Sequence, residues 1–162
     1  MLRALLSMVS LAVVAAVPVT SQSADGGGLF TQNCLMCHQA GAVGLPGQFP
    51  RLAGRIAAIS SKPKGRAYLI DVLTYGMAGK ITVDDQSIIG LMPPFAQLSN
   101  DEVAGVLSYV QSLESPPTGT PAAGTPAVFT AEEVQAGRAR PVKSATDVRA
   151  ERQSLEDAKL IR

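Results

Sequence analysis

The chain has 162 residues, a formal net charge of +1 and only 4% aromatic residues, with no tryptophan. A chain of this length can form one domain with appendages, and its scattered basic residues argue against a nucleic-acid-binding protein. Because a small domain buries a smaller fraction of its surface than a large one, so few aromatic side chains make a dense core difficult to build. A large buried cofactor would supply the missing apolar volume.

The first 24 residues have the layout of a secretory signal peptide. A short positive start with Arg3 precedes an uncharged stretch of 16 residues, 4–19, and a small polar run follows it. We predict cleavage near Ser21–Ala24 and therefore export to the periplasm. The alternative is an uncleaved membrane anchor, for which the stretch is short, since a membrane-spanning helix needs about 20 apolar residues.

Three zones follow the predicted signal peptide. Residues 25–114 carry the periodic patterns of a compact domain. Residues 115–128 are rich in Pro, Thr, Ala and Gly and contain no charge, which predicts an extended linker. Residues 129–162 are strongly charged and contain helix-capping side chains, so they are predicted to form a partly helical tail.

The first predicted helix, residues 26–37, carries both cysteines and leads directly to the only histidine. The pattern C-x-x-C-H is the attachment signature of c-type haem. The thiols of Cys34 and Cys37 can form thioethers with the two vinyl groups of one porphyrin, and the adjacent His38 can supply a nitrogen ligand to the iron. Because glycines weaken an isolated helix, this helix needs packing or a cofactor to hold it.

Three other interpretations of the cysteine pair are weaker. A thioredoxin-like redox pair needs a βαβ setting, and none is visible around the motif. A zinc site needs four ligands, and the chain has no further Cys or His. A disulfide across this spacing would be strained within a helix. The sequence therefore favours one covalently bound haem c.

Two more helices are predicted, at 66–77 and 100–113, with a small turn or hairpin at 81–86 between them. The 66–77 segment has an apolar stripe at helical spacing, which consists of Leu69, Ile70, Leu73 and Met77. Ser99 and Glu102 match the capping box at the start of the last helix. Its apolar stripe consists of Val103, Val106, Leu107 and Val110. The remaining segments are rich in Gly and Pro and are predicted to be loops.

A haem iron bound by His38 has a sixth coordination position, which is open or filled by a second side chain. The candidates are Met36, Met77, Met92 and the lysines. Met36 lies inside the attachment loop and is too close, and Met77 falls on a helical stripe where a core role is expected. Met92 is followed by two prolines, which fix φ and stiffen the loop. We therefore predict Met92 as the second axial ligand.

Three stretches together resemble the bacterial class I monohaem cytochromes c, and most closely the small periplasmic type associated with dehydrogenases and terminal oxidases. They are GGLFTQNCLMCH, FPRLAGR and GLMPPFAQLSNDEVAGVLSYV, and the resemblance covers residues 25–114. It implies an all-α fold of three to five short helices around one haem. It also implies haem attachment through Cys34 and Cys37 and axial ligation by His38 and Met92.

The resemblance assigns further roles around the haem. Pro50, Leu52 and Gly54 match the loop whose proline carbonyl accepts the proton on the other nitrogen of the axial histidine, a bond that orients the ring. Arg55 matches a position that can pair with a haem propionate, although it could equally be a solvated loop residue. The first helix is implied to pack on the last through Gly26, Phe30 and Tyr109.

The chain departs from the resemblance at one loop and beyond residue 114. Asp84-Asp85 stands where relatives usually have an Asn-Gly or Asp-Gly turn, and Ile88-Ile89 stands where they have a polar or aromatic pair. The charged tail lies outside the class I core. It is either a solvated, partly disordered extension or a tether for a dehydrogenase subunit.

Two protein ligands on the iron would leave no room for a substrate, so the sequence predicts an electron-transfer protein and not an enzyme. A periplasmic dehydrogenase is the expected donor, and a terminal oxidase or another cytochrome is the expected acceptor. The alternatives are a fixed haem subunit of a dehydrogenase complex and a gas-binding or peroxidatic haem protein with an open sixth site. The predicted docking surface is an apolar rim at the haem edge, formed by Leu35, Met36, Val43, Leu45, Pro93 and Phe95.

Overall fold

The computed structural model describes residues 24–113, 127–141 and 143–161. The predicted signal peptide, apart from residue 24, and most of the predicted linker lie outside these residues. Before the linker, the elements in chain order are α1 (Gly26–Asn33), α2 (Leu35–His38), a 3₁₀ turn (Ala40–Ala42), α3 (Arg55–Ser60), α4 (Pro63–Tyr75), β1 (Met77–Val83), β2 (Gln86–Met92) and α5 (Asn100–Ser112). After the linker come α6 (Ala131–Arg138) and α7 (Ala145–Asp157). Among the described residues, no helix is both long enough and apolar enough to cross a membrane.

The first and last helices of the predicted domain pack closely on each other, as the resemblance implies. A Cβ atom on Gly26 would lie 2.1 Å from the carbonyl oxygen of Gly105, so α1 and α5 meet backbone to backbone. Beside this contact, the rings of Phe30 and Tyr109 lie 5.6 Å apart at an interplanar angle of 50°. This tilted arrangement is a favourable one for aromatic pairs. The contact fixes the direction in which α1 delivers the cysteine motif.

The helix boundaries differ from the predicted ones. The predicted helix 26–37 is interrupted at Cys34, whose φ of −120° separates α1 from α2. The predicted helix 66–77 instead begins at Pro63 and ends at Tyr75, because Gly76 has a φ of 72° and turns the chain. Helix α3 was not predicted at all. The last predicted helix is confirmed as α5, and the capping box of Ser99 and Glu102 is present.

The expectation of a purely all-α fold is wrong, because β1 and β2 form an antiparallel hairpin. The predicted turn at 81–86 is its tip, but the strands extend until Met77 lies opposite Met92. Asp84 and Asp85 both have positive φ, at 51° and 61°, which is the backbone of a type I′ turn that usually carries Asn-Gly or Asp-Gly. The Asp84-Asp85 loop therefore keeps the backbone geometry of this turn, although its sequence differs from the usual Asn-Gly or Asp-Gly. The buried face of the hairpin consists of Ile81, Val83 and Ile88.

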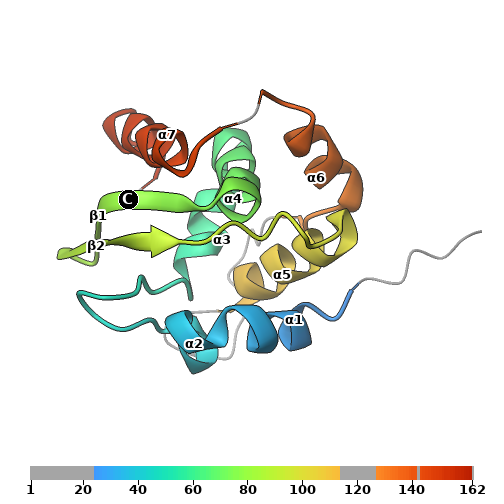
Figure 1. Ribbon diagram of the computed structural model, residues 1–162, viewed down its shortest axis with the longest axis horizontal. Coiled ribbons are helices and arrows are strands. Elements are labelled where there is room, and N and C mark those ends of the chain that lie inside the picture. The colour runs from blue at the N-terminus through green and yellow to red at the C-terminus, as the bar shows by residue number, and fades with distance from the viewer. Residues whose placement is uncertain (1–23, 114–126, 142, 162) are drawn as a thin grey trace, which may run out of the picture.

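The tail is helical, but it does not extend into solvent. Figure 1 shows α7 above the hairpin and α6 beside α5, with α4 between them. Val134 on α6 and Val148 on α7 are completely buried and belong to the same apolar core as α1, α4 and α5. The expectation of a solvated, partly disordered extension is therefore not met. The reason is that α4 is apolar on more than one face and needs cover on the side away from α5.

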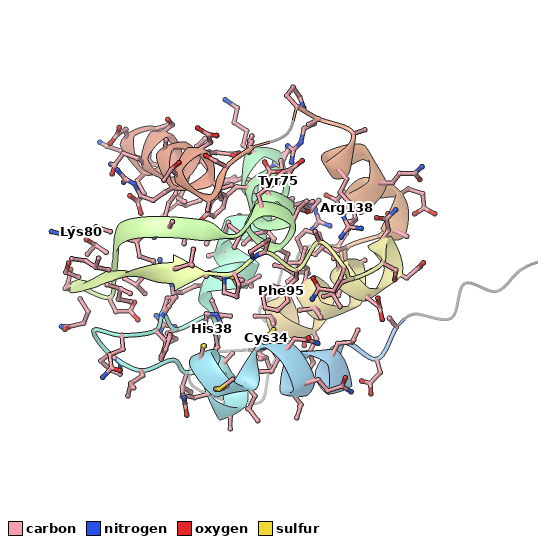
Figure 2. All side chains as sticks on the ribbon, in the orientation of Figure 1. Cys34, His38, Tyr75, Lys80, Phe95 and Arg138 are labelled. Atoms are coloured by element: carbon pink, nitrogen blue, oxygen red, sulfur yellow. The ribbon has the colours of Figure 1, made fainter. Side chains whose placement is uncertain are left out.

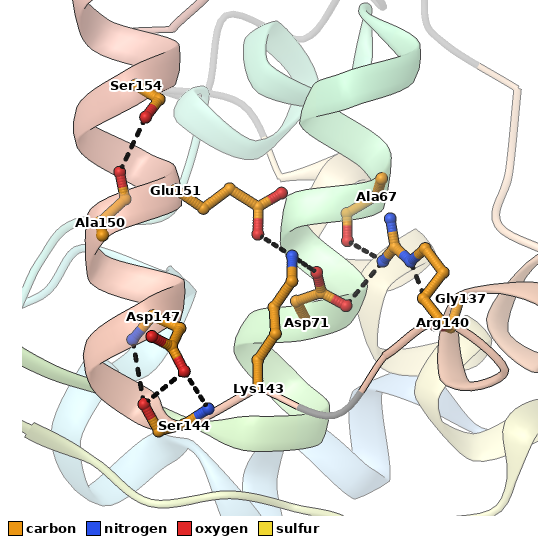
Figure 3. A network of polar contacts seen from close by, with 10 residues as sticks. All are labelled: Ala67, Asp71, Gly137, Arg140, Lys143, Ser144, Asp147, Ala150, Glu151 and Ser154. Atoms are coloured by element: carbon orange, nitrogen blue, oxygen red, sulfur yellow. Dashed lines mark hydrogen bonds and ion pairs between the residues drawn. The ribbon is translucent and has the colours of Figure 1, made fainter.

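Charged groups join the tail to α4 (Figure 3). Asp71, which is only 1% exposed, accepts hydrogen bonds of 2.6 Å from both Arg140 and Lys143. Lys143 also contacts Glu151 on α7. A second connection runs from Arg66 on α4 to Glu133 on α6, with both nitrogen–oxygen distances 2.7 Å.

Candidate cofactor site

A cavity of about 120 Å³ lies between α2 and the β1–β2 hairpin. Figure 2 shows His38 and Cys34 below the hairpin and Phe95 beside it. A second, almost wholly apolar pocket reaches toward α4 and α5 and shares four lining residues with the first, namely Cys34, His38, Met92 and Phe95. The cysteine motif and Met92 are therefore brought to one apolar site.

The break after α1 places the cysteine motif on its own helical turn. The backbone N–H groups of Cys37 and His38 donate to the carbonyl oxygen of Cys34, at 3.2 and 2.9 Å. Cys34, Cys37 and His38 all border the cavity. Because the motif residues share one short turn, the two sulfur atoms and the imidazole are presented from the same side.

The His38 ring is held by the loop that follows. Its Nδ1 lies 3.0 Å from the carbonyl oxygen of Pro50, and because a carbonyl only accepts, Nδ1 must carry the proton. The side chain is 6% exposed. This burial lowers the pKa of His38, and the Pro50 hydrogen bond opposes the shift only in part. The imidazole is therefore neutral, and Nε2 carries the lone pair that can bind a metal. The structure thus contains the hydrogen bond between His38 and the Pro50 carbonyl that the resemblance implies.

The two cysteines are free thiols in this structure. Burial, and to a smaller extent the neighbouring Cys37, raises the pKa of Cys34 to about 11. Since the thiolate is the form that binds metals and exchanges disulfides, this environment disfavours a thiolate metal site or a redox dithiol. Within the described parts of the chain, no group of three or more His, Cys, Asp and Glu side chains could hold a metal ion.

The three methionines considered as ligands have different settings. Met36 is 87% exposed and does not border the cavity. Met92 lies at the end of β2 and borders both pockets. Met77 was predicted on a helix, but it lies on β1 and also borders the cavity. Its Sδ accepts a hydrogen bond of 3.4 Å from the hydroxyl of Tyr68.

The backbone around Met92 is fixed against the end of α4. A Cβ on Gly76 would lie 2.4 Å from the carbonyl oxygen of Met92, so only glycine permits this approach. A further contact follows directly after the proline pair, where Phe95 N donates to Leu73 O at 2.7 Å. The prolines that follow Met92 are thus held at one end by the hairpin and at the other by α4.

Arg55 lies outside the walls of the cavity. Its guanidinium is 3.4 Å from Asp84 at the hairpin tip, where Arg51 also binds through two hydrogen bonds of 2.7 and 2.9 Å. Burial, followed by the charge of Arg152 on α7, lowers the pKa of Arg55. Of the other loop residues, Leu52 borders the second pocket. The propionate role of Arg55 stays a prediction.

Several residues of the site were not predicted from the sequence. Ile81 and Ile88 form the wall of the cavity on the side of the hairpin. The alternation of apolar and polar residues around Ile81 and Val83 was a signal for a strand with one buried face. Tyr68, which holds Met77, is on the helix predicted from its apolar neighbours, and no local pattern marks its hydroxyl.

The residues present fit a haem. A neutral histidine with a free Nε2, a thioether at Met92 and two thiols on one turn border the same cavity, and the walls are mostly apolar. A covalently bound macrocycle would supply the apolar volume that the aromatic-poor sequence lacks.

Comparisons with known proteins support the interpretation of this cavity as a haem site. Residues 21–110, more than half of the chain, match the family described as "Cytochrome C oxidase, cbb3-type, subunit III". The chain is 41% identical over 132 residues to Cytochrome c-552 of Thermus thermophilus, an alignment that covers 82% of this chain and 97% of that protein. A Cytochrome c-552 from a named strain of the same species has the same identity over 132 residues and is covered to 86%. Family members carry haem c and transfer electrons. The chain therefore belongs to the cytochrome c family and is a monohaem bacterial cytochrome c.

Proposed function

We propose that this protein is an exported electron carrier in which one haem is attached through Cys34 and Cys37 and ligated by His38 and Met92. The observation that carries the proposal is the hydrogen bond from His38 Nδ1 to Pro50 O, because it leaves Nε2 as the only ring nitrogen able to bind iron. Met92 borders the same cavity as His38, which supports its role as the second ligand.

The haem, when bound, supplies a one-electron couple, and the chain's residues set its conditions. Two axial side chains leave no coordination position for a substrate, which favours outer-sphere electron transfer over catalysis. A methionine ligand raises the reduction potential relative to a second histidine. The Pro50 carbonyl orients the His38 ring and increases its basicity. The apolar walls exclude water and disfavour the extra charge of the ferric state.

Exposed apolar side chains near the cavity support a docking surface for redox partners. Met36, Val43 and Leu45 are 87%, 56% and 39% exposed. On the hairpin side of the cavity, Ile89 and Leu91 are 77% and 68% exposed, and these two extend the rim predicted from sequence. We propose a periplasmic dehydrogenase as donor and a terminal oxidase or another cytochrome as acceptor. The family description, which names an oxidase subunit, favours a second candidate, a fixed haem subunit of a larger complex.

Replacement of Met92 with alanine tests the ligand assignment. We expect the ferric wild-type protein to show the weak far-red charge-transfer band of methionine–iron ligation, and Met92→Ala to lose it and to bind carbon monoxide in the ferrous state. Met77→Leu is the matched control, since it removes the other thioether that borders the cavity and should keep the band. A wild-type protein without the band that binds carbon monoxide readily would contradict the proposal.

The rate of electron transfer to a partner should depend only weakly on salt. Residues 25–116 contain six basic and seven acidic side chains, so the domain has no large charge of one sign. Strong electrostatic steering accelerates association by roughly 10-fold or more and is lost as ionic strength rises. Stopped-flow measurement from low to moderate salt should show a smaller change than this. A steep fall would mean that charged residues, and not the apolar rim, control docking.

A further inference from the structure

Two thioethers border the cavity, and their positions on the backbone are equivalent. Met77 begins β1 and Met92 ends β2, and the register of the hairpin places them directly opposite each other. Opposed residues of an antiparallel pair have Cα atoms only about 4.5–5.5 Å apart. Both side chains line the cavity that His38 also lines. Strand position alone therefore does not decide which sulfur would bind an iron held by His38.

A hydrogen bond distinguishes the two sulfur atoms. The hydroxyl of Tyr68 on α4 donates to Met77 Sδ at 3.4 Å. Tyr68 is 2% exposed, so its hydroxyl cannot exchange this partner for water, and a buried donor without a partner costs about 1–3 kcal/mol. A thioether is a weak acceptor, but here its lone pair is engaged by a donor that has no solvent alternative.

A buried arginine of the tail acts on the same tyrosine. Arg152 on α7 is 5% exposed. Burial raises the pKa of the Tyr68 hydroxyl, and the positive charge of Arg152 opposes this shift only in part. Arg152 is itself placed by Thr82 O at 3.3 Å and by Glu156 at 2.8 Å.

We propose that Tyr68 is a positioning residue that holds the Met77 thioether away from the iron, so that Met92 is the only sulfur available as the second axial ligand. The inference rests on the proposed function, since it assumes a haem ligated by His38. It assigns the buried tyrosine a role in choosing the ligand.

The test is Tyr68→Phe in the haem-loaded protein, which removes the hydroxyl and keeps the ring. Proton NMR of the ferrous protein reports the axial methionine as strongly upfield methyl and methylene signals. We expect one set in the wild type and a second set in Tyr68→Phe that disappears in Tyr68→Phe/Met77→Leu. Tyr75→Phe, the same change on the same helix, is the control and should give one set. A single unchanged set in Tyr68→Phe would overturn the inference.

A second measurement separates this inference from the proposed function. Met92→Ala should lack the far-red band, and Met92→Ala/Tyr68→Phe should regain it because the released Met77 takes the vacant position. Adding Met77→Leu should remove the band again. Loss of the band in Met92→Ala with no recovery in the double variant would leave the carrier proposal intact and refute the role of Tyr68. A band that persists in Met92→Ala alone would refute the ligand assignment itself.

Discussion

Gly26→Ala is expected to destabilise the protein by about 3 kcal/mol or more. The added Cβ would lie 2.1 Å from the carbonyl oxygen of Gly105 and 2.5 Å from its carbonyl carbon. Both atoms belong to the backbone of α5, so no side-chain rotation relieves the overlap, and the two helices must separate. Alanine is a better helix former than glycine by about 1 kcal/mol. The clash is larger than this gain, so the net effect is a loss.

Gly27→Ala is the matched control, because it adds the same methyl group one residue further along α1. There the nearest atom outside the neighbouring residues is a ring carbon of Tyr109 at 3.3 Å, which a small ring movement can accommodate. We expect unchanged or slightly increased stability. Urea denaturation of both variants, followed by far-ultraviolet circular dichroism, measures the difference. A Gly26→Ala protein as stable as the wild type would show that α1 and α5 can move apart without cost.

The proximal half of the site was predictable because it is local. Cys34, Cys37 and His38 lie within five residues on one helical turn, so their spacing alone places them together. Pro50 required the resemblance, since nothing in its own sequence context shows that its carbonyl reaches His38. The α1–α5 contact was likewise predicted only through matched family positions.

The length of the hairpin was underestimated from the sequence for a physical reason. Met77 continues the helical stripe of Leu69, Ile70 and Leu73, so periodicity alone extends the helix through it. The chain stops the helix with Gly76, whose positive φ is a common C-terminal signal. The next residues then alternate between buried and exposed, as in Ile81 and Val83. A stop signal inside a regular pattern outweighs the pattern.

The packing of the tail could not be read from its own composition. Charge and capping residues predict helices but not what they cover. The clue lies instead on α4, where Asp71 interrupts an apolar run and is almost completely buried. A buried carboxylate needs partners, and Arg140 and Lys143, which lie beyond the linker, supply them. The alignment with Cytochrome c-552 spans 132 residues of the chain and therefore extends beyond residue 114 into the tail.

Asp71→Asn should separate the tail from α4 and cost about 3 kcal/mol or more. The substitution keeps the shape of the side chain and removes the charge that Arg140 and Lys143 share. One amide oxygen can still accept a hydrogen bond, but the amide nitrogen would face a cation. Because the site is 1% exposed, water cannot replace the lost interactions at the carboxylate. Reduced protection of α6 and α7 in hydrogen exchange, with a lower urea midpoint, is the expected result.

Asp84→Asn makes the identical chemical change in an exposed ion pair and is the control for Asp71→Asn. Asp84 binds Arg51, but its side chain is 44% exposed, and exposed pairs contribute only about 0–1 kcal/mol. Asparagine also tolerates the positive φ at this turn, so no backbone strain is added. If the two variants lose similar stability, burial of Asp71 is not what makes its ion pairs important. A much larger loss at Asp71 identifies the tail as part of the folded core and not an appendage.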